Sequence, residues 1–263
     1  MKTTDVKAYS NGKNTGIQVF VCKDYDALSK KAAAIVSGEI NKKAHFVLGL
    51  ATGTSPIGLY TELAELNAEG KVDFAGVTTY NLDEYYPIAP ENDQSYRYFM
   101  NKYLFNKVNI DMAETHLLNG KAEDADAECK AYDEAIVAAG NVDLQVLGIG
   151  CNGHIGFNEP GDKFIMGTHL VTLTENTIEA NSRLFNSADE VPRYALSMGI
   201  GAIMNAKQIV LVANGKNKAK AIKDALEGEV TPWCQASVLQ LRSNVVFVLD
   251  EDAASELTEY KPL

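Results

Sequence analysis

Short apolar segments alternate with longer amphipathic segments along almost the whole chain. The apolar segments have the length and the branched or aromatic content of β-strands, and they cover residues 16–22, 45–50, 77–83, 143–149, 195–198, 208–213 and 245–250. Helical patterns of about ten to fifteen residues separate many of them, for example after Asp24, a typical N-cap residue. This alternation predicts right-handed crossovers and an open, mostly parallel α/β sheet with helices on both faces.

The 263 residues are predicted to form one α/β domain, 1–263, because no internal repeat, low-complexity tract or linker divides them. The segment from about 157 to 186 has many polar residues and few strong element signals, so we expect it to act as a lid. Open α/β sheets bind ligands at the carboxyl ends of their strands. The residues that follow each strand are therefore the candidates for a functional site.

Composition excludes several classes of partner. The chain has 24 Lys and Arg against 35 Asp and Glu, a net charge of −11, which argues against a nucleic-acid binder. No apolar stretch approaches the roughly 20 residues of a membrane span, and the first residues lack the apolar core of a signal peptide. The four cysteines lie far apart, with no metal-binding spacing. We therefore expect a cytoplasmic protein with free thiols, no metal and no membrane partner.

Two strand ends carry residues suited to an anion. The segment 52–55 (Thr-Gly-Thr-Ser) joins a strand to a helix near Pro56, where backbone N–H groups and the helix dipole favour an anion. The alternative is an ordinary turn in which Ser55 caps the helix. After the strand at 208–213, the lysines of segment 216–220 open another helix, either as a solvated charge run or as cations facing a ligand.

Acidic residues and a histidine follow two other strands. Asp83 and Glu84 are adjacent, so their side chains should point to opposite faces of an extended chain. They are either solvated acids or include one general base. The segment 148–153 matches GxGxxG, but the glycines and proline that follow exclude the helix that a dinucleotide site needs. What remains is a glycine-rich loop that presents His154, which titrates near neutrality as a proton shuttle requires, and Glu159. Cys151, in the same loop, is expected to pack as a small apolar residue.

Together these segments resemble the glucosamine-6-phosphate deaminase family from about residue 16 to residue 257. The most specific matches are Asn-Leu-Asp-Glu-Tyr at 81–85 and Gly-His-Ile-Gly-Phe-Asn-Glu-Pro-Gly at 153–161. Supporting matches are Thr-Gly-Thr-Ser-Pro at 52–56, Asn-Ser-Arg-Leu-Phe at 181–185 and Lys-Asn-Lys-Ala at 216–219. The resemblance implies a modified Rossmann-like fold and a reversible, cofactor-free conversion of glucosamine 6-phosphate and water to fructose 6-phosphate and ammonia, a C–N hydrolysis with isomerase chemistry.

The resemblance also implies roles for individual residues. Asp83 would move a proton between C2 and C1, His154 would catalyse ring opening, and Glu159 would orient the imidazole. Glu84 would support the site from the opposite face, and Asn152 would hydrogen-bond the imidazole. The residues implied to hold the substrate phosphate are Thr52, Gly53, Thr54, Ser55, Arg183 and Lys218.

Alternatives to a deaminase stay open at this point. A 6-phosphogluconolactonase-like hydrolase on the same fold would share the Gly-His loop but lack the Phe-Asn-Glu-Pro continuation. A phosphosugar sensor would keep the pocket without the chemistry. Family members range from monomers to hexamers, so either a monomer or a homo-oligomer is compatible with the sequence.

The segment after the Asn-Glu-Pro motif predicts a non-allosteric enzyme. Allosteric members bind N-acetylglucosamine 6-phosphate there through basic and hydroxyl residues, whereas segment 162–171 of this chain is Asp-Lys-Phe-Ile-Met-Gly-Thr-His-Leu-Val. Asn152, where some members have Asp, also occurs in the non-allosteric branch. We expect hyperbolic kinetics that this ligand does not change. A sigmoidal rate curve that becomes hyperbolic on its addition would contradict this prediction.

Overall fold

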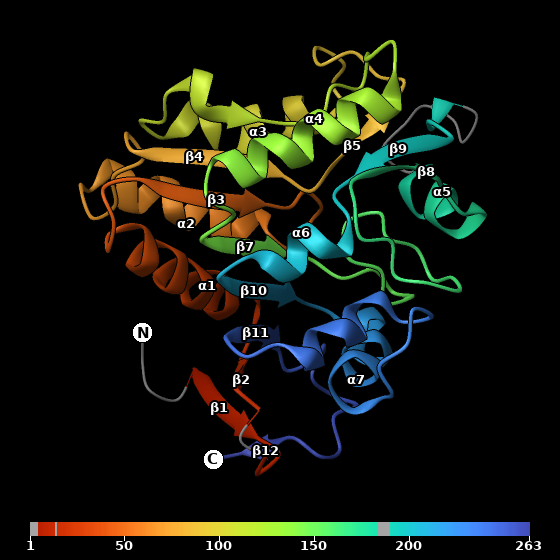
Figure 1. The fold of residues 1–263 in the computed structure, drawn as a ribbon. Coiled ribbons are helices and arrows are strands. Elements are labelled where there is room, and N and C mark those ends of the chain that lie inside the picture. The colour runs from red at the N-terminus through yellow and green to blue at the C-terminus, as the bar shows by residue number, and fades with distance from the viewer. Residues whose placement is uncertain (1–4, 14, 183–189) are drawn as a thin grey trace.

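The larger sheet of the protein confirms the predicted α/β architecture. The computed structural model describes residues 5–13, 15–182 and 190–263. Within them, the strands of this sheet lie in the order β12-β1-β2-β11-β10-β7-β3-β4-β6 (Figure 1). Their bounds are β1 (Val6–Ser10), β2 (Ile17–Cys22), β3 (Phe46–Leu50), β4 (Val77–Asn81), β6 (Thr115–His116), β7 (Leu144–Leu147), β10 (Gln208–Ala213), β11 (Val245–Asp250) and β12 (Lys261–Pro262). All neighbours from β2 to β6 pair in parallel, and only β1 and β12 pair antiparallel, at one edge.

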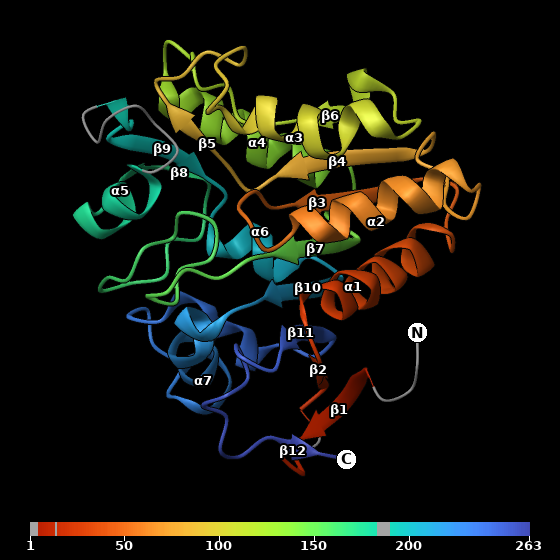
Figure 2. The ribbon, with the colours of Figure 1, turned by 180° about the vertical axis from the view of Figure 1, so that it is seen from behind.

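Helices cover both faces of this sheet, as the alternation predicted. Figure 2 shows α1 and α2 side by side across one face, and Figure 1 shows α6 on the other. The α-helices are α1 (Tyr25–Ile40), α2 (Ile57–Ala68), α3 (Tyr96–Tyr103), α4 (Ala125–Ala138), α5 (Glu175–Ser182), α6 (Ile200–Asn205) and α7 (Ala219–Glu227). Among the described residues, none of the helices is long and apolar enough to cross a membrane.

A smaller antiparallel sheet stands beside the carboxyl ends of the parallel strands. It has the order β5-β9-β8, with β5 (Asp83–Tyr86), β8 (His169–Thr172) and β9 (Tyr194–Ser197). Its buried side chains form a separate apolar cluster, to which α5 contributes Ile178. Strand β8 was not predicted, because His169, Leu170 and Thr172 are exposed or half-buried and only Val171 is buried.

The strand predicted over 77–83 is in fact two strands in two sheets. The chain bends at Leu82, whose N–H donates to Leu50 O beside β3 at 3.0 Å. Leu82 O accepts a hydrogen bond at 2.6 Å from the N–H of Met198, which follows β9. The prediction was wrong because a buried leucine makes the bend, with no glycine or proline to mark it. As a consequence, Asp83 lies at the junction of the sheets.

Two helix starts differ in how they are capped. Asp24 caps α1 as predicted, since its carboxylate accepts the Ala27 N–H at 2.9 Å. Ser55 does not cap α2, because its hydroxyl donates to Asn214 Oδ1 at 2.7 Å. Instead, the Tyr25 hydroxyl of α1 accepts a hydrogen bond from the first turn of α2, from the Gly58 N–H at 2.8 Å.

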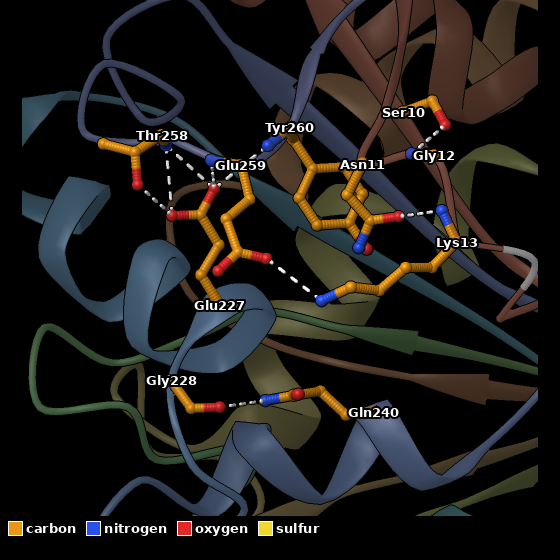
Figure 3. Close-up of polar contacts among 10 residues, drawn as sticks. All are labelled: Ser10, Asn11, Gly12, Lys13, Glu227, Gly228, Gln240, Thr258, Glu259 and Tyr260. Carbon is orange, nitrogen blue, oxygen red and sulfur yellow. Dashed lines mark hydrogen bonds and ion pairs between the residues drawn. The ribbon is translucent and has the colours of Figure 1, made fainter.

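The lysine-rich segment forms a 3₁₀ turn (Lys216–Lys218) before α7, where a single helix was predicted. At the other end of α7, Glu227 accepts backbone N–H groups of Thr258, Glu259 and Tyr260 (Figure 3). Glu259 in turn pairs with Lys13 at 3.3 Å. The C-terminal segment is thereby tied both to α7 and to the chain between β1 and β2.

Candidate active site

A cavity of about 430 Å³ lies at the carboxyl ends of the parallel strands. Four segments line it: 51–56 after β3, Leu82 and Asp83 at the sheet junction, 148–157 after β7, and Asn217–Lys218 after β10. Ligand sites of open α/β sheets lie at this end of the strands. The structure thus brings together the four strand ends that the sequence singled out.

Asp83 projects into this cavity from the first position of β5. It is only 6 % exposed, and burial together with the nearby Glu84 carboxylate raises its pKa to about 8. A Cβ atom on Gly156 would lie 3.6 Å from Asp83 Oδ2, so this glycine leaves space next to the carboxyl group. The carboxyl group therefore changes its protonation near neutral pH while it faces a cavity.

Glu84 does not line the cavity. Its carboxylate accepts three backbone N–H groups, from Tyr85 at 3.0 Å, Tyr96 at 2.8 Å and Arg97 at 3.0 Å. Tyr96 and Arg97 begin α3, so a carboxylate there also meets the positive end of a helix dipole. Burial raises the pKa of Glu84, and the three hydrogen bonds offset part of that effect. Glu84 thus connects β5 to α3.

His154 and Glu159 face each other across the glycine-rich loop. His154 Nδ1 lies 3.5 Å from Glu159 Oε2, an ion-pair distance without hydrogen-bond geometry. Their side chains are 22 % and 8 % exposed. Burial alone would raise the pKa of Glu159, but the His154 ring and hydrogen bonds from Thr177 and Asn152 hold it below its ordinary value. The carboxylate therefore stays ionised beside the ring.

Asn152 takes a different position from the one expected. Its Nδ2 donates to Glu159 Oε2 at 2.8 Å, and its Oδ1 accepts the backbone N–H of His154 at 3.2 Å. It makes no hydrogen bond to the imidazole, because Glu159 lies within reach of its amide. Asn152 thus orients the carboxylate rather than the ring.

The expected phosphate-binding residues divide into three groups. Thr52, Gly53 and Thr54 line the cavity with Ser55, and the left-handed φ of +99° at Gly53 turns the backbone there. Ser55 directs its hydroxyl at Asn214, so only its backbone N–H remains for an anion. Lys218 lines the cavity and has no carboxylate partner among the described residues. Arg183 lies outside the described residues.

Sequence reasoning missed several cavity residues and misplaced one. Tyr96 and Thr177 line the cavity from α3 and α5, and Phe157 and Asn217 complete it. A histidine or an acidic residue after a strand is a recognisable sequence signal for a site, whereas a tyrosine or threonine inside a helix is not. Cys151 is exposed at the cavity, where Asn217 Nδ2 approaches its Sγ at 3.4 Å. The expectation that it packs as an apolar residue was wrong because the described residues leave Cys151 exposed at the cavity.

Within the described part of the chain, no group of three or more His, Cys, Asp or Glu side chains is arranged to hold a metal ion. A dinucleotide site would also need a helix directly after the GxGxxG match at 148–153. The described chain after Gly153 forms turns instead of a helix. That the protein works without metal or cofactor stays a prediction.

Gly150 offers a test of the His154 position. A Cβ there would lie 2.5 Å from Nδ1 and 2.6 Å from Nε2 of the imidazole, so Gly150→Ala must displace the ring. We expect turnover of the substrate that the sequence resemblance implies to fall about 10- to 100-fold, because small displacements of a reacting group have effects of that order. In Gly161→Ala, the matched control, the new methyl group would meet only Glu159 O at 3.9 Å. Equal activity of the two variants at equal thermal stability would contradict the prediction.

Comparisons with known proteins agree with the geometry. The family model described as "Glucosamine-6-phosphate isomerases/6-phosphogluconolactonase" matches residues 23–247. A glucosamine-6-phosphate deaminase from Clostridioides difficile (strain 630) is 51% identical over 247 residues, 93% of this chain and 99% of the relative. One from Thermoanaerobacter sp. (strain X514) is 52% identical over 91% of this chain and 94% of its own length.

Solved structures give the same assignment. A monomeric glucosamine-6-phosphate deaminase superposes with a TM-score of 0.89 at 43% identity, over 91% of this chain and 99% of the other. A 6-phosphogluconolactonase from Thermotoga maritima shares the fold, with a TM-score of 0.69 at 19% identity over 89% of this chain and 99% of its own. The chain belongs to the glucosamine-6-phosphate deaminase family.

Proposed function

We propose that this protein converts glucosamine 6-phosphate and water to fructose 6-phosphate and ammonia in amino-sugar breakdown. The observation that carries the proposal is the placement of Asp83 and His154 in one cavity with the 52–55 turn and Lys218, while Glu159 lies outside the cavity lining, 3.5 Å from His154 Nδ1. A proton-transfer carboxyl, a ring-opening histidine and an anion-binding turn are what this reaction needs. The lactonases, at below 25% identity, share the fold alone.

The phosphate would bind at the 52–55 turn, where α2 begins, with Lys218 as a cation. Binding energy from this remote group would then hold C1 and C2 of the sugar near Asp83. Because the reacting carbons do not carry the phosphate, its contacts position the substrate without taking part in the bond changes.

The reaction would begin with ring opening. His154 would shuttle the proton: it would give one to the ring oxygen and take up the one that the C1 hydroxyl loses, which leaves an open-chain aldehyde. Glu159, held by Asn152 and Thr177, would keep the imidazole oriented. This role explains why the carboxylate lies beside the ring rather than in the cavity.

Asp83 would then remove the proton from C2 and return it to C1 through an enediol-type intermediate that carries nitrogen at C2. The resulting imine at C2 would add water and release ammonia, so that one water is consumed and the C–N bond is broken hydrolytically. A carboxyl group with a pKa near neutrality can both accept and return the proton, as this step requires.

Further proposals concern the context of the reaction. We propose one functional domain over 1–263, in which segment 157–186 closes over the sugar. The described part of this segment contains β8 and α5, and Thr177 of α5 lines the cavity. We also propose a cytoplasmic enzyme whose cavity is complete within one chain, since the residues assigned above come from a single copy, and a related deaminase is monomeric.

The proposal predicts that the purified protein releases ammonia and fructose 6-phosphate in equal amounts from glucosamine 6-phosphate. Asp83→Asn should lower kcat by about 10²-fold or more, because the proton acceptor is lost, while KM changes little. Asp93→Asn, at an exposed site, is the matched control. Hydrolysis of 6-phosphogluconolactone without ammonia release would favour the lactonase alternative, and phosphosugar binding without turnover would favour a sensor.

The raised pKa of Asp83 makes a second prediction, about stability. Between pH 4 and pH 8 the folded protein holds a proton on Asp83 that the unfolded chain, with a pKa of 3.8, releases, so stability falls as the pH rises. Asp83→Asn removes this effect and should stabilise the fold by roughly 1–3 kcal/mol at pH 8.5 but little at pH 4. Thermal unfolding at both pH values measures the difference. An equal change at both, or one no larger than in Asp93→Asn, would contradict the assignment.

A further inference from the structure

Helix α5 contributes a hydrogen bond to the proton-transfer machinery. The Thr177 side chain is 5 % exposed, lines the cavity and donates its hydroxyl proton to Glu159 Oε1. This contact links two segments 18 residues apart. Helix α5 thereby contacts the carboxylate that lies beside His154.

The two oxygens of the Glu159 carboxylate have different partners. Oε1 accepts from Thr177, whereas Oε2 accepts from Asn152 at 2.8 Å and lies 3.5 Å from His154 Nδ1. Asn152 is in the same loop as His154, so its contact is local. Thr177 supplies the contact from outside that loop and thereby sets the plane of the carboxylate.

Thr177 is itself held by the start of α5. Thr174 Oγ1 donates to Thr177 Oγ1 at 3.1 Å and accepts the Thr177 backbone N–H at 3.3 Å. One residue further along, Ile178 is buried in the apolar cluster of the smaller sheet. The hydroxyl therefore reaches Glu159 only when the first turn of α5 is docked on this sheet.

From this chain of contacts we infer that Thr177 is a positioning residue that couples the docking of α5 to the orientation of Glu159, and through it to proton transfer by His154. Without the hydroxyl, Oε1 of a buried carboxylate would lack a partner, and the group would rotate to find one. Rotation takes Oε2 away from the imidazole. The inference rests on the proposed function and adds that ring opening depends on the docking of α5.

The test compares Thr177→Val, which keeps the shape without the hydroxyl, with Thr177→Ser, which keeps the hydroxyl. We expect Thr177→Val to lower kcat for ammonia release about 10- to 100-fold with KM within about 3-fold. Thr177→Ser should restore kcat to within about 3-fold of the unaltered enzyme. Thr172→Val, at an exposed position of β8, is the matched control for a threonine in the same segment.

A binding measurement separates positioning from damage to the pocket. Sorbitol 6-phosphate, an open-chain phosphosugar, needs no ring opening, so Thr177→Val should bind it as the unaltered protein does. A kcat of Thr177→Val equal to that of the control, failure of Thr177→Ser to restore activity, or parallel loss of binding would overturn the inference. If Thr177→Val does not fold, Thr177→Ala replaces it under the same criteria. An unaltered enzyme that releases no ammonia would instead reject the proposed function.

Discussion

The bend at Leu82 is the constraint on which the rest of the site depends. Its N–H and C=O bind the ends of two different sheets, so the chain can leave the parallel sheet without exposing buried backbone groups. The next residue, Asp83, is thereby placed where the sheets meet, buried on the protein side and facing the cavity on the other. The smaller sheet also carries β8 and supports α5, so this bend positions both the carboxyl group proposed to transfer the proton and helix α5.

Electrostatics within the site follows from how each carboxyl group is paired. The side chains of Asp83, Glu84 and Glu159 are all largely buried, yet among the described residues no group donates a hydrogen bond to Asp83, which faces the cavity. Glu84 has the N–H groups of α3, and Glu159 has Asn152 and Thr177. In a protein of net charge −11, an anionic substrate is not drawn in by a broad positive field, so the proposed phosphate binding depends on local donors, the 52–55 turn and Lys218.

Much of the fold and the position of the site could be predicted from the chain alone, because apolar periodicity and strand ends are local signals. Four short strands were missed, since they have few buried side chains: β1, β6, β8 and β12. The division of 77–83 between two sheets depends on partners far away in the sequence, Leu50 and Met198. The same holds for Ser55 and Asn152, whose side chains took partners, Asn214 and Glu159, that local rules do not reveal.

The Tyr25 hydroxyl, which replaces the expected serine cap of α2, also donates to the carbonyl groups of the 52–55 turn, at 3.0 Å to Thr54 O and 3.1 Å to Ser55 O. The turn is therefore fastened to the first residue of α1 before any ligand arrives. An anion that binds there orders little protein, and the entropy lost on binding falls mainly on the sugar itself. In the proposed function the two sides of the cavity thus differ in preorganisation: the side proposed to bind the phosphate is already formed, whereas the side that carries α5 would close around the bound substrate.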